Sequence, residues 1–514
     1  MTFFESLLTL LLVAVGLLQI SRRLSLPYPA MLAAAGVAVA FVPGAPDIPI
    51  DPGTALALFV APALLDAAFD FPPGAARRFW VPLVTFAVVA VFVTCAAVAL
   101  LGHMLLGLPI AAAVALGAMV APPDAAAATA VLNSTSIPQS TDAILKGESL
   151  FNDATALLLF NASLAVVAHG HLTGPIAIRL GLAAPGGVLF GIVAALLMRR
   201  IHPFVRDSLG GTLLQFCGTY LIWIAADHLG LSAVLSLVAY AMTLARTSEI
   251  IHNYTRMRVH SYAVWSSVVF ALNVFAFLLM GMQVRTIVRQ MQREHLYQAL
   301  RFSAVVVLVV IVIRLVIVLT FNRVVSWRAR AKGQKEPASL NQGILVGWSG
   351  IRGFVTLATA FALPSSFPHR DTVVLTAFSV VLVTLVVQGL TLAPLIRWLG
   401  LDQTDASERE LQSARAALAT VAIATLSHRS SPEAEQLRFV YSLDRDSAAG
   451  EAVSCRFEDY RKTGLIAIRA ERKELERMRT RDQLGANLYL KLQEELDWRE
   501  LTLLPEDHRQ IEES

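Results

Sequence analysis

The chain has 514 residues, of which 56% are hydrophobic and 16% are charged, against about 25% charged residues in ordinary soluble domains. Residues 1–400 contain 25 Lys or Arg and 15 Asp or Glu, whereas residues 401–514 contain 17 and 23. This contrast predicts a membrane domain over 1–400 and a soluble, helical cytoplasmic domain over 401–514. It excludes a soluble enzyme with one core. It also excludes nucleic acid as a partner, because the basic excess behind the pI near 9.0 lies between apolar runs.

Thirteen apolar stretches in the first 400 residues are candidates to cross a bilayer, which takes about 20 residues. They are 3–20, 28–43, 54–71, 80–101, 109–132, 143–167, 174–198, 210–229, 231–246, 261–284, 302–322, 341–364 and 372–399. No basic segment precedes the first stretch, so we expect no cleavable signal peptide. The fold class predicted is an all-α polytopic membrane protein with a helical C-terminal tail.

The connections between these stretches differ in charge. Starting with the connection after the first stretch, one alternate set carries 16 Lys or Arg when Lys146 and Arg246, which lie just inside the adjoining stretches, are included, and the opposite set carries 5. Because basic loops stay in the cytoplasm, the asymmetry predicts an outside N-terminus and a cytoplasmic C-terminus in the inner membrane. The connection at 285–301 departs from this trend, and we expect an amphipathic stretch at the outer interface.

Two of the stretches are interrupted. Residues 121–124 read Ala-Pro-Pro-Asp, and each proline removes an amide donor and clashes with the preceding turn of a helix. The twelfth stretch is weakened by repeated glycines, namely Gly343, Gly347, Gly350 and Gly353. The interruptions lie seven stretches apart, as expected for two inverted six-helix repeats, and paired interruptions mark the binding sites of secondary transporters.

The sixth stretch carries the densest set of polar side chains. On a helix, Ser149 and Asp153 share one face, and Glu148 and Asn152 share the adjacent face. The first face offers a carboxylate and a hydroxyl to a small cation, and hard cations prefer oxygen ligands. The second face holds a carboxylate that needs a counter-ion.

Other charged side chains inside the stretches cost about 2.5–3.5 kcal/mol each on insertion scales, so each needs a function or a partner. Arg352 is the expected partner of Glu148, whereas the sequence does not identify a partner for Arg314. Asp124 is placed to cap the second half of its own broken helix, and the alternative is a simple proline kink that Asp124 caps without any part in binding. Asp66 either reaches the same cavity or is hydrated near the cytoplasmic end.

At these residues the chain resembles the electroneutral branch of the monovalent cation/proton antiporters, bacterial relatives of the animal sodium/proton exchangers. The matching motifs are 61–68, 121–132 (APPDAAAATAVL), 147–157 (GESLFNDATAL) and 347–357 (GWSGIRGFVTL). The resemblance covers roughly residues 5–400. It implies a thirteen-helix protomer, usually a homodimer, with a mobile core domain and a dimerisation domain.

The resemblance also implies roles for single residues. It implies that Asp153 binds either the cation or a proton. It marks Glu148 and Arg352 as a structural ion pair, and Asn152 as the position that is a second aspartate in the electrogenic branch. It implies help at the cation site from Ser149, Asp124, Asp66 and the backbone carbonyl of Pro123.

Two departures from the family pattern bear on ion selectivity. Many relatives have Thr-Asp-Pro where this chain has Pro-Asp-Ala at 123–125, so one hydroxyl contact is absent. Many have Glu where this chain has Asp66, which is one methylene shorter.

The expected function is exchange of Na⁺, or K⁺ or Li⁺, for H⁺ by competition at Asp153, one for one and electrically silent because Asn152 is uncharged. Acid should then inhibit cation binding. We expect no cofactor beyond the transported ions. The expected partners are the lipid bilayer and a second copy of the chain, with a tail that binds a regulator or self-associates.

Two transport alternatives remain open. The first is a K⁺/H⁺ antiporter, because selectivity rests on ångström-scale geometry that the sequence does not give. The second is an organic-solute carrier of related fold, or a passive channel. Asp66, Asp124 and Asp153 favour a cation as substrate, and a requirement for a counter-proton separates an exchanger from a channel.

An intramembrane serine protease is a remote alternative. Residues 347–350 read Gly-Trp-Ser-Gly and match the GxSG motif of such enzymes. That chemistry needs a histidine base within reach of Ser349. The nearest later histidine, His369, lies in an expected loop, and no second motif supports proteolysis.

Overall fold

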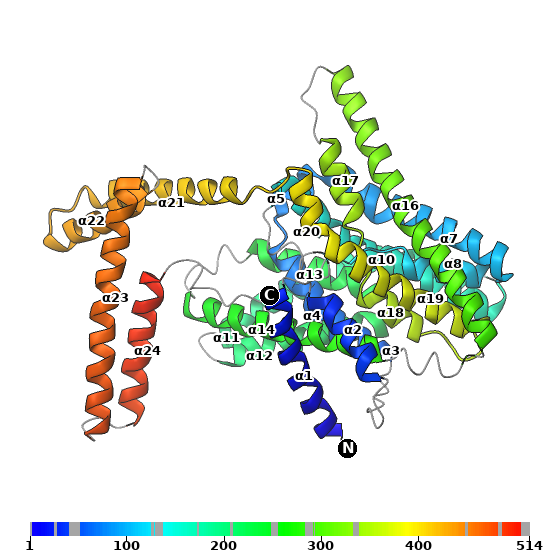
Figure 1. The fold of residues 1–514 in the computed structure, drawn as a ribbon, viewed down its shortest axis with the longest axis horizontal. Coiled ribbons are helices and arrows are strands. Elements are labelled where there is room, and N and C mark those ends of the chain that lie inside the picture. The colour runs from blue at the N-terminus through cyan, green and yellow to red at the C-terminus, as the bar shows by residue number, and fades with distance from the viewer. Residues whose placement is uncertain are drawn as a thin grey trace. The chain divides into compact units, whose positions relative to one another are not determined.

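The computed structural model describes residues 3–24, 28–40, 52–124, 128, 137–171, 174–205, 209–247, 255–282, 291, 293–332, 339–447, 451–481 and 486–504. Every regular element in these ranges is a helix (Figure 1). The chain separates into two compact units, with the boundary between Asp402 and Gln403.

The first unit holds the apolar helices. In chain order they are α1 (Phe3–Leu24), α2 (Tyr28–Ala40), α3 (Pro52–Ala55), η1 (Leu56–Val60), α4 (Ala61–Asp70), α5 (Pro73–Arg78), α6 (Trp80–Val84), η2 (Thr85–Ala90), α7 (Val91–Leu106), α8 (Ile110–Val120), α10 (Gln139–His169), α11 (Gly174–Val205), α12 (Leu209–His228), α13 (Ala233–Thr247), α14 (Thr255–Met282), α16 (Arg293–Ala331), α17 (Leu340–Trp348), α18 (Phe354–Phe361), α19 (Arg370–Val383), η4 (Thr384–Gln388) and α20 (Gly389–Trp398). Each of the thirteen predicted stretches overlaps one or more of these helices.

Seven helical segments of the described chain are long and apolar enough to cross a membrane. They are Gly53–Asp70, Trp80–Leu106, Gln139–His169, Gly174–Ile201, Ser261–Leu279, Arg293–Ala331 and Arg370–Trp398. Shorter apolar helices include Tyr28–Ala40, Ile110–Val120 and Ala233–Arg246. The broken stretches account for part of this shortness, because a helix that is interrupted in mid-membrane appears as two short pieces.

Glycines bring some of these helices into close contact. A methyl group on Gly36 of α2 would overlap the backbone carbonyl of Leu278 in α14, and one on Gly281 would overlap the carbonyl of Ala33 in α2. In lipid, small residues let helix backbones approach, since burial of apolar side chains gives little drive there. The packing of α2 on α14 therefore depends on glycine at both positions.

In the part of the chain that the structure describes, three π-helical turns lie inside long apolar helices. They are η1, η2 and η4, and each continues directly into α-helix on both sides. A π-turn adds a residue to one turn and redirects the side chains beyond it, and such turns are frequent at functional sites. The turn η4 lies beside the second broken stretch, as described below.

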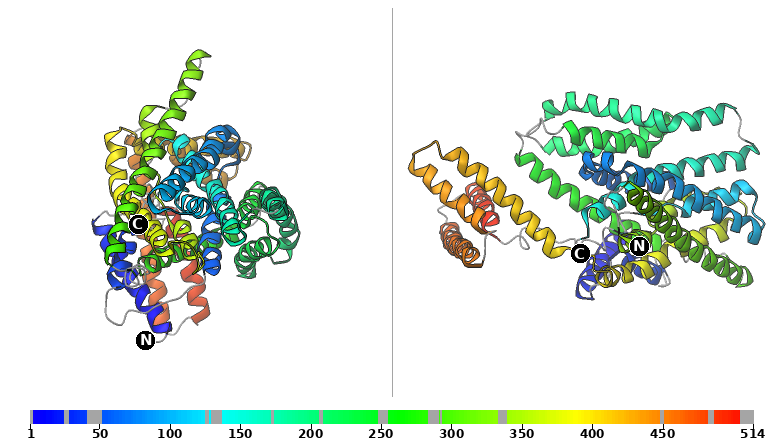
Figure 2. Two further views of the ribbon diagram at one scale, coloured as in Figure 1. Left: turned by 90° about the vertical axis from the view of Figure 1, so that its right-hand side faces the viewer. Right: turned by 90° about the horizontal axis from the view of Figure 1, so that it is seen from above.

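Helix α16 is the longest helix described. Its 39 residues span about 58 Å at 1.5 Å per residue, whereas a hydrocarbon core is about 30 Å thick. It extends past the start of α17 in Figures 1 and 2. Residues 293–301, which belong to the expected amphipathic stretch, form the first turns of α16, while 285–290 and 292 lie outside the described residues.

The second unit contains α21 (Thr404–Leu426), α22 (Pro432–Ser447), α23 (Glu451–Thr480) and α24 (Ala486–Leu503). Leu475, Tyr489 and Leu496 form a small core between α23 and α24. Across the same pair, Arg472 Nε donates to Glu500 at 2.9 Å, and its Nη2 donates to Asp497. These hydrogen bonds raise the pKa of the Arg472 guanidinium, and the bond to Asp497 has the largest effect.

Candidate functional site

Both predicted interruptions are confirmed. Helix α8 ends at Val120, and the buried prolines Pro122 and Pro123 follow without helical structure. Helix α17 ends at Trp348, and α18 begins at Phe354 after a non-helical stretch at 350–353. The two non-helical stretches meet each other in the core of the first unit.

Asp124 joins the two stretches. Its backbone N–H donates to the carbonyl of Ile351 at 2.7 Å, and its Oδ2 accepts from the backbone N–H of Phe354 at 3.3 Å. The carboxylate therefore caps α18, where the helix dipole favours negative charge. The expected cap of its own second half-helix falls on 125–127, outside the described residues. A methyl group on Gly353 would overlap the Asp124 carboxylate, so this contact requires glycine.

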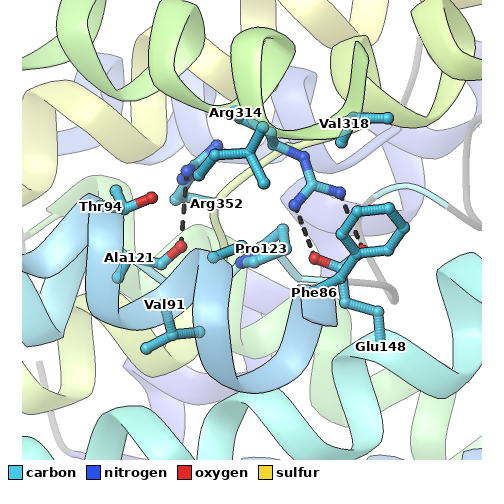
Figure 3. A pocket seen from close by; sticks show the side chains of 11 residues that line it. Phe86, Val91, Thr94, Ala121, Pro123, Glu148, Arg314, Val318 and Arg352 are labelled. Atoms are coloured by element: carbon cyan, nitrogen blue, oxygen red, sulfur yellow. Dashed lines mark hydrogen bonds and ion pairs between the residues drawn. The ribbon is translucent and has the colours of Figure 1, made fainter. Parts of the chain in front are cut away.

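Arg352 neutralises the end of the other half-helix. Its side chain is buried, at 1% exposure. Nη2 donates to the carbonyl of Ala121 at 3.4 Å (Figure 3). Nε donates to the carbonyl of Val120 at 3.2 Å, and Nη1 to that of Gly350. The carbonyls of Val120 and Ala121 are among those that the C-terminus of α8 leaves without intrahelical partners. A cation there also balances the negative end of the α8 dipole.

The predicted ion pair of Glu148 with Arg352 is wrong. Glu148 pairs with Arg314 of α16 through two hydrogen bonds, Nη1 to Oε1 at 2.6 Å and Nη2 to Oε2 at 3.0 Å (Figure 3). Arg314 Nη2 also donates to the carbonyl of Val346 at 3.2 Å. A methyl group on Gly350 would overlap the Arg314 side chain, so this glycine leaves room for the pair.

A small cavity lies between these charged groups. It has room for about one water molecule and is lined by both arginines, Glu148, Thr94 and residues of α16 and η2. Arg314 Nε has no hydrogen-bond partner among the described residues. Buried polar groups of this kind are commonly satisfied by ordered water.

Asp153 and Asn152 lie one residue apart in α10, and both are buried, at 8% and 0% exposure. Asn152 Nδ2 donates to the carbonyl of Pro123 at 2.8 Å, so the amide holds the first broken stretch. Asp124 follows Pro123 directly and Asp153 follows Asn152 directly, so this hydrogen bond brings the two aspartates to the same region. Ser149 is half-buried one turn before Asp153 on the same helix.

The two neighbouring carboxylates, Asp124 and Asp153, determine which ions the site can bind. Two carboxylates in a poorly hydrated region repel each other unless a proton or a cation lies between them. Oxygen atoms are available from both carboxylates and from the Pro123 carbonyl, which has a second lone pair. No cluster of three or more His, Cys, Asp or Glu among the described residues forms a divalent-metal site.

Two further residues singled out in the sequence are Asp66 and Ser349. Asp66 is half-buried on α4, a helix that packs on α10, and its part in the site stays a prediction. Ser349, the serine of the protease alternative, is buried and donates to the carbonyl of Leu345 at 2.8 Å. Within the described residues, no histidine is hydrogen-bonded to it.

Comparison with known proteins places this geometry in a family. Residues 7–398 match the family model described as "Sodium/hydrogen exchanger, transmembrane". The chain belongs to the sodium/hydrogen exchanger family. The resemblance drawn from the four motifs is thereby confirmed, and this family member is a multi-pass membrane protein of a transporter family.

Curated relatives of this exchanger-family chain carry antiporter names. It is 28% identical over 422 residues to "Na(+)/H(+) antiporter NhaH" of Halobacillus dabanensis, covering 77% of the chain and 98% of the relative. It is 28% identical over 384 residues to "Sodium, potassium, lithium and rubidium/H(+) antiporter" of Bacillus pumilus. That match covers 71% of this chain and only 57% of the relative.

A solved structure shares the fold. The sodium proton antiporter MjNhaP1 from Methanocaldococcus jannaschii matches with a TM-score of 0.57 and 18% identity. The match covers 76% of this chain and 100% of that chain. A second structure of the same protein gives a TM-score of 0.59.

Proposed function

We propose that this exchanger-family chain exchanges Na⁺ for H⁺ across the cytoplasmic membrane, with Li⁺ and K⁺ as further substrates. The observation that carries the proposal is Asp153, a buried carboxylate beside Asp124 at the meeting point of two broken helices. One carboxylate cannot hold a proton and a cation at once. Competition between the two therefore couples their fluxes, and acid inhibits cation binding.

The neighbouring charges support an electrically silent, one-for-one exchange. Glu148 is balanced by Arg314, and Asn152 is uncharged. Arg352 supplies a positive charge to the crossing at which Asp124 lies. Asp153 is then the group whose charge changes when the ion changes, so one cation replaces one proton.

The architecture proposed with this function has thirteen crossings, two inverted six-helix repeats and a homodimer. The N-terminus lies outside and the C-terminus in the cytoplasm, in keeping with the excess of basic residues on alternate connections. The helical tail from residue 403 is proposed to bind a regulator or to self-associate. A rocking or sliding core that carries the broken helices exposes the site to each side in turn.

The choice between Na⁺ and K⁺ is the closest alternative. The Bacillus pumilus relative is named for four alkali cations, whereas the Halobacillus relative is named for Na⁺ alone. A series of alkali chlorides added to proteoliposomes with an internal pH-sensitive dye ranks the cations. The same assay rejects proton-coupled cation exchange if organic solutes, and no alkali cation, move protons.

The central test is Asp153→Asn in the same proteoliposomes. The amide keeps the shape of the side chain and loses the exchangeable charge, so we expect cation-driven proton flux to fall to background. Asp227→Asn, which changes an exposed carboxylate near the end of α12, is the matched control and should retain full flux. Appreciable exchange by Asp153→Asn would rule out competition at this residue.

Electroneutrality is tested on the wild-type protein. A dye that reports membrane potential should stay unchanged while a cation gradient drives proton movement. A potential that follows the cation gradient would show that the stoichiometry is not one for one.

A further inference from the structure

Each broken stretch is held by a polar side chain from the next long helix in the chain. After the first stretch comes α10, whose Asn152 donates to the carbonyl of Pro123 at 2.8 Å. After the second stretch comes the helix formed by α19, η4 and α20. There Thr384 Oγ1 accepts a hydrogen bond from the backbone N–H of Arg352 at 3.0 Å.

The bonding of Thr384 has a fixed direction. The hydroxyl carries one proton, and it donates that proton to the carbonyl of Val380 at 2.8 Å in its own helix. A lone pair is thereby left for the Arg352 N–H. Thr384 is fully buried, at 0% exposure, so water cannot take its place.

The position of Thr384 in its helix is unusual. It is the first residue of the π-turn η4, which lies within an otherwise α-helical segment. The turn redirects the side chains at its ends relative to a regular helix. Thr384 faces the broken stretch from this point, and the preceding buried threonine of the same segment, Thr376, instead meets Ser303 of α16.

Arg352, the residue bonded to Thr384, lies in the chain between the two residues that hydrogen-bond to Asp124. The carbonyl of Ile351 accepts from Asp124 N–H, and the N–H of Phe354 donates to Asp124 Oδ2. Arg352 is between them in the chain, so fixing its backbone fixes the spacing of both contacts. Thr384 thus acts on the Asp124 carboxylate through two short links, and Asp124 in turn lies beside Asp153.

We propose that Thr384 is a positioning residue for the cation site, which holds the second broken stretch at the place where it presents the Asp124 carboxylate to Asp153. The proposal rests on the proposed function for its transport readout. Its structural claim, that Thr384 immobilises 350–354, is independent of that function.

The test compares Thr384→Val with Thr384→Ser and with Thr359→Val in full-length protein. Valine keeps the shape and removes the acceptor, whereas serine restores it. Thr359 is the matched control, because it is equally buried and its hydroxyl bonds only to carbonyls of its own helix, α18.

In proteoliposomes we expect Thr384→Val to raise the Na⁺ concentration for half-maximal exchange by about tenfold, the effect of one lost buried hydrogen bond. The maximal rate should change less. Thr384→Ser should return to within about twofold of wild type, and Thr359→Val should stay within the same margin. Equal effects of the two valine variants, or no rescue by serine, would overturn the proposal.

Hydrogen–deuterium exchange on the same variants separates the two claims. The peptide that covers 350–354 should exchange faster in Thr384→Val than in wild type. Its exchange rate should be unchanged in Thr359→Val. If wild type shows no cation exchange, the proposed function fails while this readout still tests the tether. If 350–354 is equally protected in Thr384→Val, the tether itself is refuted. Thr384→Ala, which adds no new contact, replaces valine if that variant does not fold.

Discussion

The membrane unit and the tail each contain an arginine that pairs with acidic side chains, in very different surroundings: Arg314 pairs with one carboxylate and Arg472 with two. In the first unit, the side chains of Arg314 and Glu148 are 5% and 2% exposed. In the tail, those of Arg472, Asp497 and Glu500 are 33%, 50% and 27% exposed. Water can replace a lost partner in the tail, whereas the cavity beside Glu148 has room for only about one water molecule. The same chemical pair is therefore a structural necessity in one unit and a minor contribution in the other.

The largest expected effect comes from leaving Glu148 alone. Arg314→Met keeps most of the side-chain volume and removes the charge, so an unpaired carboxylate remains buried. Breaking a buried pair from one side costs about 3–5 kcal/mol. We expect a much lower melting temperature in detergent and a low yield of folded protein, measured by thermal denaturation with size-exclusion chromatography.

The double variant Arg314→Met/Glu148→Leu sharpens this comparison. Replacement of a whole buried pair by apolar side chains is often nearly neutral, so most of the lost stability should return. A second double variant, Glu148→Leu/Arg352→Met, leaves Arg314 unpaired and should not recover. Recovery by the second and not by the first would contradict the pairing described here.

The next effect concerns Gly353. In Gly353→Ala the added methyl group would overlap the Asp124 carboxylate, so the crossing of the two broken stretches must shift. Overpacking of a tight interior costs about 1–3 kcal/mol, and the displaced carboxylate should lower cation exchange by more than tenfold. Gly181→Ala in α11 is the control, because nothing lies within 4 Å of its added methyl group. Equal exchange by the two variants would show that the contact with Asp124 is unimportant.

The sequence was sufficient to predict where the helices break, but not how the charges pair. Two consecutive prolines and a run of glycines act on the backbone locally, so Pro122, Pro123 and the stretch at 350–353 could be predicted without the fold. Pairing is different, since Arg314 and Arg352 both lie in apolar surroundings and the sequence offers one obvious partner, Glu148. Only the fold shows that Arg352 is bound by the carbonyls at the end of α8.

Asp124 was predicted to cap its own second half-helix, whose first residues, 125–127, lie outside the described residues. Its position after two prolines indicated a helix cap, and it is one. The helix described as capped is α18, which begins 230 residues later in the chain. Thr384 carried no local signal at all, because a threonine in an apolar helix usually bonds to its own turn, and the π-turn that redirects it has no distinct sequence pattern.

The smallest expected effect lies in the tail. Arg472→Gln should change the stability of the α23–α24 pair by about 0–1 kcal/mol, the usual range for exposed ion pairs. Hydrogen–deuterium exchange of residues 465–481 in the full chain measures it. Arg469→Gln, at an exposed position on the same helix, is the matched control.

Salt and pH should separate the two units further. The hydrogen bonds to Asp497 and Glu500 raise the pKa of Arg472, so its charge is present in folded and unfolded chains at working pH and adds no alkaline transition there. Salt weakens the interaction between exposed charges, with a Debye length of about 10 Å at 0.1 M that shortens as the salt concentration rises. The Arg472→Gln difference should therefore shrink in high salt, while that of Arg314→Met should not.

Because α16 is longer than a membrane is thick, movement of the buried Arg314–Glu148 pair can be measured at the ends of the helix, which reach water. Arg314 is bonded to Glu148 near the middle of one continuous rod, and the ends of that rod, at Arg293 and Ala331, lie about 32 Å and 26 Å away along its axis. Because α16 is one uninterrupted helix, we expect a change in the depth of the buried pair to move both of its ends. A spectroscopic label at either end of α16 then reports displacement of the buried Arg314–Glu148 pair.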